Sequence, residues 1–137
     1  MEIKALGPGD EDQVKAVSHL FDQASDAEAT RCFLGEPGHH LLVAYEDGHP
    51  SGFVSGVEMT HPDKGTEMFL YNLAVQSEFR RRGFGRALVD RLAAMAKERG
   101  CYGMWVVTGE ENGAALATYE SSGSTAEPGQ VVLVWTF

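Results

Sequence analysis

Apolar residues recur along this chain with two different periods, and each period predicts a different element. Residues 14–21 carry apolar side chains every three or four positions, as one face of a helix does, and an aspartate at position 10 or 12 can cap its start. A second short helix is expected over 26–34. Residues 39–59 form two apolar runs joined by Asp47-Gly48, a pair that is typical of a hairpin turn.

The second half of the chain adds a buried strand and a long helix. Residues 67–75, EMFLYNLAV, are apolar on both faces, which is typical of a strand inside a sheet. A helix with one apolar stripe is expected from Phe84 to Arg99, where Gly100 ends it. The alternation of strands and helices, with both hairpins and a crossover helix, predicts an α/β protein with a mixed sheet. The remaining expected elements are strands at 2–6, 101–108 and 130–137 and a helix at 114–122.

Length and composition favour a single domain spanning residues 1–137. The chain has 137 residues, of which 43% are hydrophobic, enough for a real core. No apolar run approaches the roughly 20 residues that a membrane helix needs, and the N-terminus lacks the pattern of a secretory signal. A cytoplasmic protein that does not bind membranes is therefore expected. Cys32 and Cys101 form no CxxC pair and do not make a disulfide framework.

The charge is acidic overall but unevenly placed. The formal net charge is −9. Residues 1–79 hold 4 Lys or Arg and 14 Asp or Glu, a balance of −10, whereas residues 80–99 hold 7 and 2, a balance of +5. Residues 100–137 hold no basic and 4 acidic side chains, a balance of −4. A confined basic block indicates a local anion site, and a nucleic-acid binder would show a wider basic face, so no nucleic-acid partner is expected.

The basic block opens with three arginines, Arg80 to Arg82, followed by Gly83-Phe84-Gly85. They stand between a strand that ends near Val75 and the start of a helix. A helix N-terminus exposes unpaired N–H groups, and glycines there let a phosphate approach the backbone. The alternative is a surface arginine cluster before an ordinary helix. A Walker loop is excluded because no lysine follows the glycines, and the dinucleotide fingerprint fails because Leu88 replaces its third glycine.

Two motifs together resemble the GNAT N-acetyltransferases. Arg80-x-x-Gly83-x-Gly85 is similar to the acyl-CoA pyrophosphate motif of that family, and LAV at 73–75 is similar to its central strand. The later NGAALATYESSG, which contains Asn112, Ala115, Tyr119 and Gly123, is similar to its second signature. The resemblance implies a central mixed, mostly antiparallel sheet flanked by about four helices and split between two central strands.

The resemblance also implies acetyl-CoA as co-substrate, without a metal. The backbone of the central strand would pair with the pantetheine arm, and the N–H groups of 81–86 would hold the pyrophosphate, with the arginine side chains secondary. Asn112 either caps the helix that follows it or also contacts the pantetheine arm. The histidines at 39, 40, 49 and 61 fit no zinc pattern. The cofactor-binding residues implied are Leu73, Ala74, Val75, Arg80, Arg81, Arg82, Gly83, Phe84, Gly85, Arg86, Asn112 and Ala115.

Acetyl transfer to an amine needs a base for the amine and an acid for the departing thiolate. Tyr119 is the expected acid because the family's tyrosine has this spacing from Asn112; the alternative is a core aromatic residue. A carboxylate acting through water is the expected base. Glu67 is preferred to Glu58, Glu110 and Glu111 because its strand leads to the thioester; the alternative for each of the four is a solvated carboxylate without a role in the reaction. A cysteine nucleophile is not expected, since neither cysteine belongs to a Cys/His arrangement.

The acceptor is expected to be a small polycationic amine, which the acidic surface would attract. FLYNLAVQSEFRRRGFGRALVDRL resembles the aminoglycoside 3-N-acetyltransferase branch of the family, although Asn72 stands where that branch usually has aspartate. Asn72, Glu110 and Glu111 are the expected acceptor contacts. Linear polyamines and protein amines are alternative acceptors, and an acyl-CoA-binding module without turnover and an anion-regulated interaction domain are the non-enzyme alternatives. The chain is also compatible with a homodimer.

Overall fold

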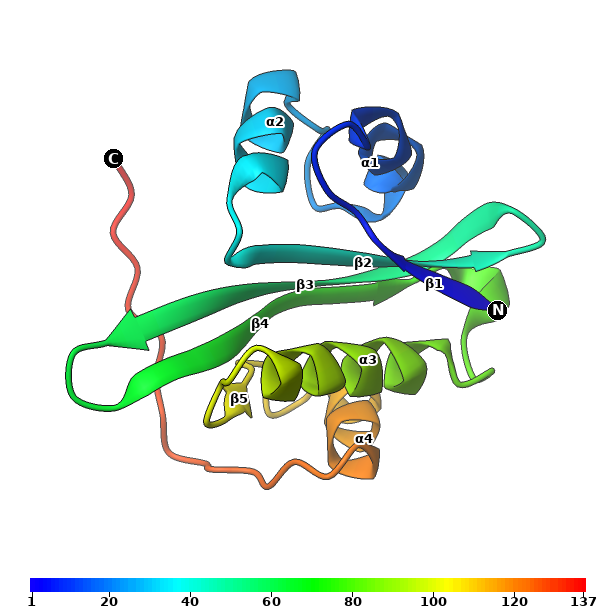
Figure 1. Cartoon of the computed structure of the whole chain (residues 1–137). Helices are drawn as coiled ribbons and strands as arrows, with labels where there is room; N and C mark the ends of the chain where they lie inside the picture. Colours follow the sequence, from blue (N-terminus) through cyan, green and yellow to red (C-terminus); the bar gives the residue numbers. More distant parts are fainter.

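The computed structural model describes residues 1–137 and has a five-stranded sheet at its centre (Figure 1). The strands follow one another across the sheet in chain order, and all neighbours are antiparallel except β4 and β5, which are parallel. The predicted mixed, mostly antiparallel sheet is therefore confirmed. The strands are β1 Glu2–Ala5, β2 His39–Glu46, β3 His49–His61, β4 Gly65–Val75 and β5 Met104–Trp105.

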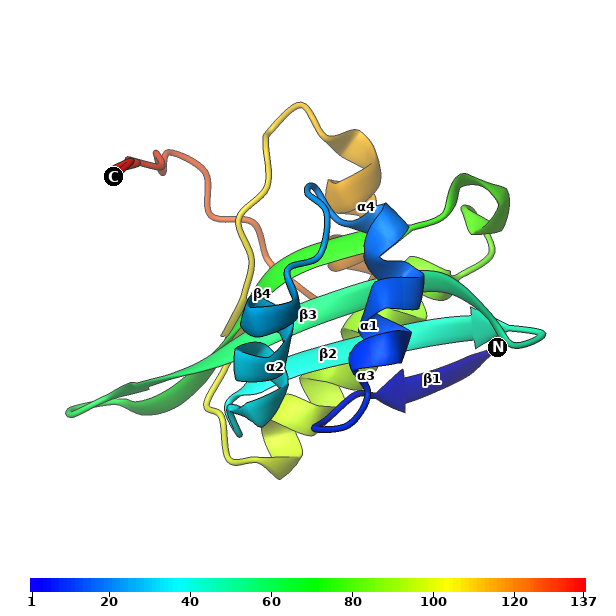
Figure 2. The same ribbon diagram turned by 90° about the horizontal axis from the view of Figure 1, so that it is seen from above.

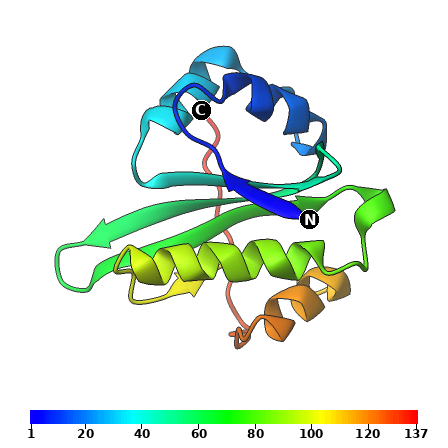
Figure 3. The same cartoon turned by 45° about the vertical axis from the view of Figure 1, so that its right-hand side comes forward.

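Four helices cover the two faces of the sheet in pairs (Figures 1 and 3). The first pair, α1 and α2, lies on one face, and α3 and α4 lie on the other, so the fold has three layers. Short 3₁₀ turns follow α1 and β4, at Ser18–Leu20 and Ser77–Phe79. None of the helices has the length and apolarity needed to cross a membrane. The helices are α1 Glu11–Val17, α2 Ala27–Gly35, α3 Phe84–Glu98 and α4 Gly113–Ser121.

Local chemistry explains where several of these elements begin and turn. The side chain of Asp26 accepts hydrogen bonds from the N–H groups of Glu28 (2.9 Å) and Ala29 (3.1 Å), so it caps α2. Asp47 and Gly48 have φ angles of 50° and 78°, the conformation that a type I′ hairpin turn requires. Both the second helix and the first hairpin therefore form where the sequence predicts them.

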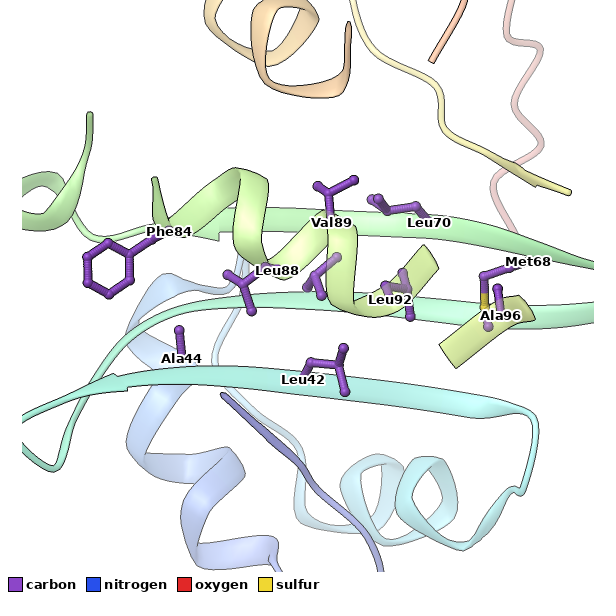
Figure 4. Close-up of a cluster of buried hydrophobic side chains, with 10 residues drawn as sticks. Leu42, Ala44, Met68, Leu70, Phe84, Leu88, Val89, Leu92 and Ala96 are labelled. Carbon is purple, nitrogen blue, oxygen red and sulfur yellow. The ribbon is translucent and has the colours of Figure 1, made fainter. Parts of the chain in front are cut away.

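Two apolar cores lie on opposite faces of the sheet. Figure 4 shows the larger one, in which one stripe of α3 packs against β2, β3 and β4. The smaller core fills the space between the sheet and the helices α1 and α2, and it includes an edge-on pair of the Phe21 and Phe53 rings at 4.9 Å. The larger core consists of Leu42, Ala44, Val54, Met68, Leu70, Phe84, Leu88, Val89, Leu92 and Ala96.

Two glycines of β3 allow α3 to lie close to the sheet. A Cβ atom on Gly52 would lie 2.9 Å from the carbonyl oxygen of Ala74, and one on Gly56 would lie 2.9 Å from the sulfur of Met68. Both positions also face leucines of α3, Leu88 and Leu92 respectively. The close packing fixes the height of α3 above β4, which sets where the start of the helix lies relative to the end of the strand.

Two of the predicted strands are wrong in extent or absent. The strand predicted at 101–108 is reduced to Met104–Trp105, and Trp105 is 45% exposed. Residues 130–137 form no strand at all, and Trp135 is 75% exposed. Pattern alone predicted both, but a strand also needs a neighbour with which its backbone can pair. The chain after residue 105 has no such neighbour in this structure.

Candidate active site

Strands β4 and β5 pair along the first half of β4 and then diverge. They pair only at Met68 with Met104 and at Phe69 with Trp105. Leu70 and Asn72 pair with consecutive residues of β3, so Tyr71 is an extra, bulged residue whose exposed fraction is 69%. The backbone from Leu73 to Val75 still pairs with β3 on one side and has no strand on the other. The free edge can therefore accept an extended ligand as an additional strand.

The turn from β4 into α3 leaves a row of backbone donors without acceptors. Arg81 and Gly83 both have left-handed backbone conformations, with φ angles of 62° and 82°. No side chain caps the helix, and no N–H group of residues 81–86 donates to an acceptor within the protein. Unpaired N–H groups and the positive end of the helix dipole favour an anion at this position.

Gly83 and Gly85 play different parts in this turn. A Cβ atom on Gly83 would meet nothing within 4 Å, so the space above it is open to a ligand. A Cβ atom on Gly85 would lie 3.4 Å from Thr118 of α4 and 3.8 Å from Val75 of β4. Gly85 is therefore where α3, α4 and the end of β4 come together. Leu73, at 4.0 Å from the same point, completes the contact.

The arginine side chains are mostly engaged by the protein itself. The Nε atom of Arg80 donates to the carbonyl oxygen of Val75 at 3.1 Å, which fixes the end of β4. Arg82 lies 3.6 Å from Glu46 and stacks over the rings of Phe79 and Phe84, with its guanidinium 5.3 and 5.4 Å from their centres. Arg86 pairs with Asp90 at 3.5 Å. Arg81 has no such partner, so the unpaired groups at the start of α3 are its side chain and the N–H groups of the backbone.

Helix α4 places Asn112 and Tyr119 beside this junction. The side chain of Asn112 accepts a hydrogen bond from the N–H of Ala115 at 3.1 Å, so it caps the helix. Tyr119 is half-buried and packs against the larger core, as Leu73 and Val75 of β4 also do. Burial raises the pKa of Tyr119, and its hydroxyl has no hydrogen-bond partner in the protein. A neutral phenol with a free O–H is available there as a proton donor.

Glu67, the preferred base, lies apart from that junction. It accepts hydrogen bonds from the hydroxyl of Tyr102 and from Trp105 Nε1 at 2.6 Å, and His61 Nε2 lies 3.4 Å away. The Tyr102 hydrogen bond lowers the pKa of Glu67 and raises the pKa of Tyr102 to about 12. Leu73 lies six positions after Glu67 on the strand, roughly 20 Å away at ~3.3 Å per step.

The three predicted acceptor contacts come from two parts of the chain, strand β4 and the loop after β5. Asn72 is half-buried, directly before Leu73 on β4, and its side chain makes no hydrogen bond within the protein. Glu110 and Glu111 are exposed in the loop that connects β5 with α4. The sequence did not point to Thr118 or Tyr102. Thr118 lies one turn after Ala115, so helical spacing could have found it, whereas no local pattern links Tyr102 to Glu67.

The fold and this junction define a class of enzyme. Residues 10–123 match the model of the acetyltransferase (GNAT) family, and the chain belongs to that family. The family match confirms the predicted N-acetyltransferase class and the predicted fold, with its mixed five-stranded sheet and four helices.

Particular relatives have acceptors of two kinds. The chain is 42% identical over 114 residues to a [ribosomal protein bS18]-alanine N-acetyltransferase of Salmonella typhimurium, which covers 81% of this chain and 70% of that enzyme. The match to the enzyme of the same name from Escherichia coli strain K12 is 40% identical over 57 residues, 42% of this chain, and spans only 38% of the relative's length. A solved aminoglycoside acetyltransferase from an uncultured soil metagenomic sample, in complex with sisomicin, superposes with a TM-score of 0.91 at 21% identity, covering 99% of this chain and 95% of that one.

Proposed function

We propose that this protein transfers the acetyl group of acetyl-CoA to an amine of a small polycationic acceptor, in the first place an aminoglycoside at its 3-N position. The main support for acetyl-CoA as the acetyl donor is the row of unpaired N–H groups at residues 81–86. It lies at the start of α3, beside the free backbone edge of Leu73 to Val75. An anion site next to an open strand edge fits a ligand with a pyrophosphate and an extended amide arm.

The donor residues follow from this geometry. The N–H groups of 81–86 hold the pyrophosphate, and the open space at Gly83 lets it approach the backbone. The free edge of β4 holds the pantetheine arm, and an N–H group there polarises the carbonyl oxygen that becomes negative during transfer. Acetyl-CoA supplies the activated acetyl thioester. Asn112 serves the site by starting α4, the helix that carries Tyr119.

Two protons move in the reaction. Tyr119, whose raised pKa keeps its phenol neutral, donates a proton to the sulfur that leaves. The acceptor's ammonium must lose a proton to a carboxylate, acting through water. Glu67 remains the proposed base. Its existing donors and lowered pKa make it a weak base. Because it lies six positions before Leu73 on β4, a chain of water molecules has to link it to the amine.

Charge supports a cationic acceptor. The protein carries −9 overall, while its basic side chains are concentrated in residues 80–99. The acidic remainder attracts a polycation, and the start of α3 attracts the anionic donor. Glu110 and Glu111 lie in the exposed loop before α4, and Asn72 lies beside Leu73, so we propose these three as acceptor contacts.

A protein amine is the second candidate acceptor, and one observation favours it. The Salmonella typhimurium relative, which is 42% identical, is named for acetylation of an alanine of ribosomal protein bS18. The relative named for aminoglycosides supports the first candidate through its fold alone, since its identity is 21%. The two candidates differ in the shape of the acceptor, a rigid set of rings against a flexible peptide.

A thiol-release assay with a panel of amines tests the proposal. The panel contains 3-amino aminoglycosides of the gentamicin type, spermidine, and peptides that begin with alanine or contain lysine. We expect the aminoglycosides to have the highest kcat/KM, and this value to fall as salt screens the attraction. Turnover of peptides alone would establish the second candidate. Binding of acetyl-CoA without thiol release on any amine would make the protein an acyl-CoA-binding module.

A further inference from the structure

Helix α4 carries Tyr119, yet it is only loosely packed against the rest of the molecule. None of its residues is buried. Seen from above, much of α4 lies beyond β4, whereas α1 and α2 lie over the strands (Figure 2). Tyr119 packs against the larger core, and Thr118 approaches Gly85 at the start of α3. A helix with so little buried surface depends on its remaining contacts to keep a fixed position.

One side-chain hydrogen bond joins the end of α4 to another element. The hydroxyl of Ser122, the residue directly after α4, donates to Oδ1 of Asp90 on α3. The second oxygen of that carboxylate, Oδ2, lies 3.5 Å from Nε of Arg86, one turn earlier on α3. The hydroxyls of Thr118 and Ser121 donate to carbonyl oxygens of α4 itself. The carboxylate of Asp90 therefore links the first turns of α3 to the end of α4.

The Ser122–Asp90 bond acts on the part of α4 that holds Tyr119. Ser122 follows Tyr119 by three residues, so both lie on the same side of the helix. The N–H groups of Ser122 and Ser124 donate to the carbonyl oxygen of Tyr119 at 3.1 and 3.2 Å. The hydroxyl of Tyr119 makes no hydrogen bond of its own within the protein. Because no polar contact fixes the phenol, the position of its O–H depends on where the backbone of α4 lies.

We propose that Asp90 is a positioning residue for acetyl transfer, which holds the end of α4 through Ser122 and so keeps the Tyr119 hydroxyl directed at the leaving sulfur. The inference rests on the proposed role of Tyr119 as the acid. The side chain of Asp90 is 49% exposed, and it acts through Ser122 instead of touching the reacting groups. A proton donor has to stay within hydrogen-bond reach of the atom that it protonates, so a small displacement of α4 slows the reaction. It leaves the N–H groups of 81–86, and hence the affinity for acetyl-CoA, unchanged.

Two neighbouring serines provide a matched pair of variants for thiol-release kinetics. Ser122→Ala removes the bond to Asp90, whereas Ser121→Ala removes a bond of 2.7 Å to the carbonyl oxygen of Thr118 within α4. We expect Ser122→Ala to lower kcat about fivefold, the effect of one hydrogen bond to a charged group, without changing the KM for acetyl-CoA. Ser121→Ala should keep the wild-type kcat. Asp90→Ala should match Ser122→Ala, and Asp90→Asn, whose amide oxygen still accepts from Ser122, should keep most of the wild-type kcat.

The same substitution in the Tyr119→Phe background separates this inference from the proposed function. If Ser122 acts through the phenol, Ser122→Ala should cause no further loss of kcat once the hydroxyl of Tyr119 is gone. A further fivefold loss there would overturn the inference. A wild-type kcat for Ser122→Ala beside a reduced kcat for Tyr119→Phe would also overturn it, while the acid would stand. A wild-type kcat for Tyr119→Phe would overturn the acid itself, and the positioning role of Asp90 with it.

Hydrogen exchange gives a readout that does not depend on turnover. The N–H of Ser124, which donates to the carbonyl oxygen of Tyr119, reports whether the end of α4 stays closed. We expect this amide to exchange several-fold faster in Ser122→Ala and in Asp90→Ala than in the wild type and in Ser121→Ala. Equal exchange in all four proteins would show that the Ser122–Asp90 bond does not hold α4, and it would overturn the inference.

Discussion

The two ends of α3 are built in opposite ways. At its start, no side chain caps the helix and the N–H groups of residues 81–86 have no acceptors. At its end, the N–H groups of Gly100 and Cys101 bond back to the helix at 3.1 and 2.9 Å. The Arg99 side chain extends the closed end further, because it donates to Glu58 at 2.6 Å and to the carbonyl oxygen of Pro37 at 3.0 Å.

The contrast separates what the helix does at each end. Glu58 lies on β3, its side chain is only 13% exposed, and it also receives a hydrogen bond from His40 at 2.6 Å. This network ties the end of α3 to β2 and β3, and it contributes to stability. The start of α3 has donors with no protein partner, and these are available to a ligand. Substitutions at the start should therefore alter binding and catalysis, and those at the end should alter stability.

The largest expected effect lies at Tyr119, which stands beside the start of α3. Tyr119→Phe keeps the ring that packs against the core and removes the hydroxyl. We expect kcat to fall about 10²-fold, in the range of general acid catalysis, while acetyl-CoA affinity is kept. Because the pKa of Tyr119 is raised, the wild-type kcat should hold until the pH exceeds 10. Steady-state kinetics against pH measures both effects, and an unchanged kcat would return Tyr119 to a purely structural role.

The next largest effect comes from a pair of glycines at the two ends. Gly83 and Gly100 have φ angles of 82° and 85°, and a Cβ atom at either would meet nothing. Valine at both positions costs similar backbone strain, but only Gly83 faces the N–H row. We expect Gly83→Val to weaken acetyl-CoA binding at least tenfold, about 1.4 kcal/mol, and Gly100→Val to leave it unchanged. Calorimetry compares them, and equal affinities would remove the anion site from the start of α3.

Local pattern predicted the elements that organise this helix. The apolar stripe of residues 84–99 predicted both ends of α3 to within one residue. Gly83 and Asn112 were identified because phosphate-binding turns and helix caps have local sequence signatures. The helix predicted over 26–34 likewise forms, and the structure shows that Asp26 is its cap. Each of these features depends on residues within four positions of one another, so a short stretch of sequence is enough to predict it.

The remaining features depend on residues that are far apart in the chain. The strand at 101–108 shrinks to two residues because β4 diverges from it at the Tyr71 bulge, and a bulge has no reliable sequence mark. The engagement of Glu67 by Tyr102 and Trp105 requires β4 and β5 to be aligned first. The segment 130–137 has the composition of a strand without a neighbour in its own chain. In each of these cases the hydrophobic pattern of the sequence does not reveal which strands or side chains lie next to each other.

A smaller effect is expected at the closed end of α3. Glu58→Gln removes the charge that Arg99 and His40 bond to and should lower the free energy of unfolding by about 1 kcal/mol. Acetyl-CoA affinity should not change, because the network is at the other end of the helix. Glu98→Gln, an exposed glutamate at the same end without an ion pair, is the control and should be neutral. Urea denaturation measures stability, and a loss of affinity in Glu58→Gln would mean that the two ends are coupled.

The pH dependence of the stability difference between the wild type and Glu58→Gln gives a second check on the hydrogen bonds around Glu58. Burial alone would raise the pKa of Glu58, but the hydrogen bonds from His40 and Arg99 lower it below its ordinary value of 4.5. A lowered pKa in the folded state adds stability above pH 4.5 and loses it as the pH falls through the folded value. The free energy of unfolding of the wild type should therefore exceed that of Glu58→Gln by a constant amount above pH 5, and this excess should shrink in stronger acid. An advantage that grows on acidification would contradict the charged network.

The smallest effect should come from Arg80, although it opens the arginine run that first indicated an anion site. Its Nε atom is occupied by the carbonyl oxygen of Val75, and its side chain is exposed. The backbone N–H groups hold the anion, so Arg80→Ala should weaken acetyl-CoA binding only about threefold, or ~0.6 kcal/mol. Arg91→Ala, an exposed arginine in the middle of α3 without an ion pair, controls for the loss of one positive charge and should change the affinity even less. Calorimetry at low and moderate salt distinguishes the two. A tenfold loss for Arg80→Ala would move the main anion contact from the backbone of the α3 start to its arginine side chains, and the contrast between the two helix ends would then rest on side-chain charge.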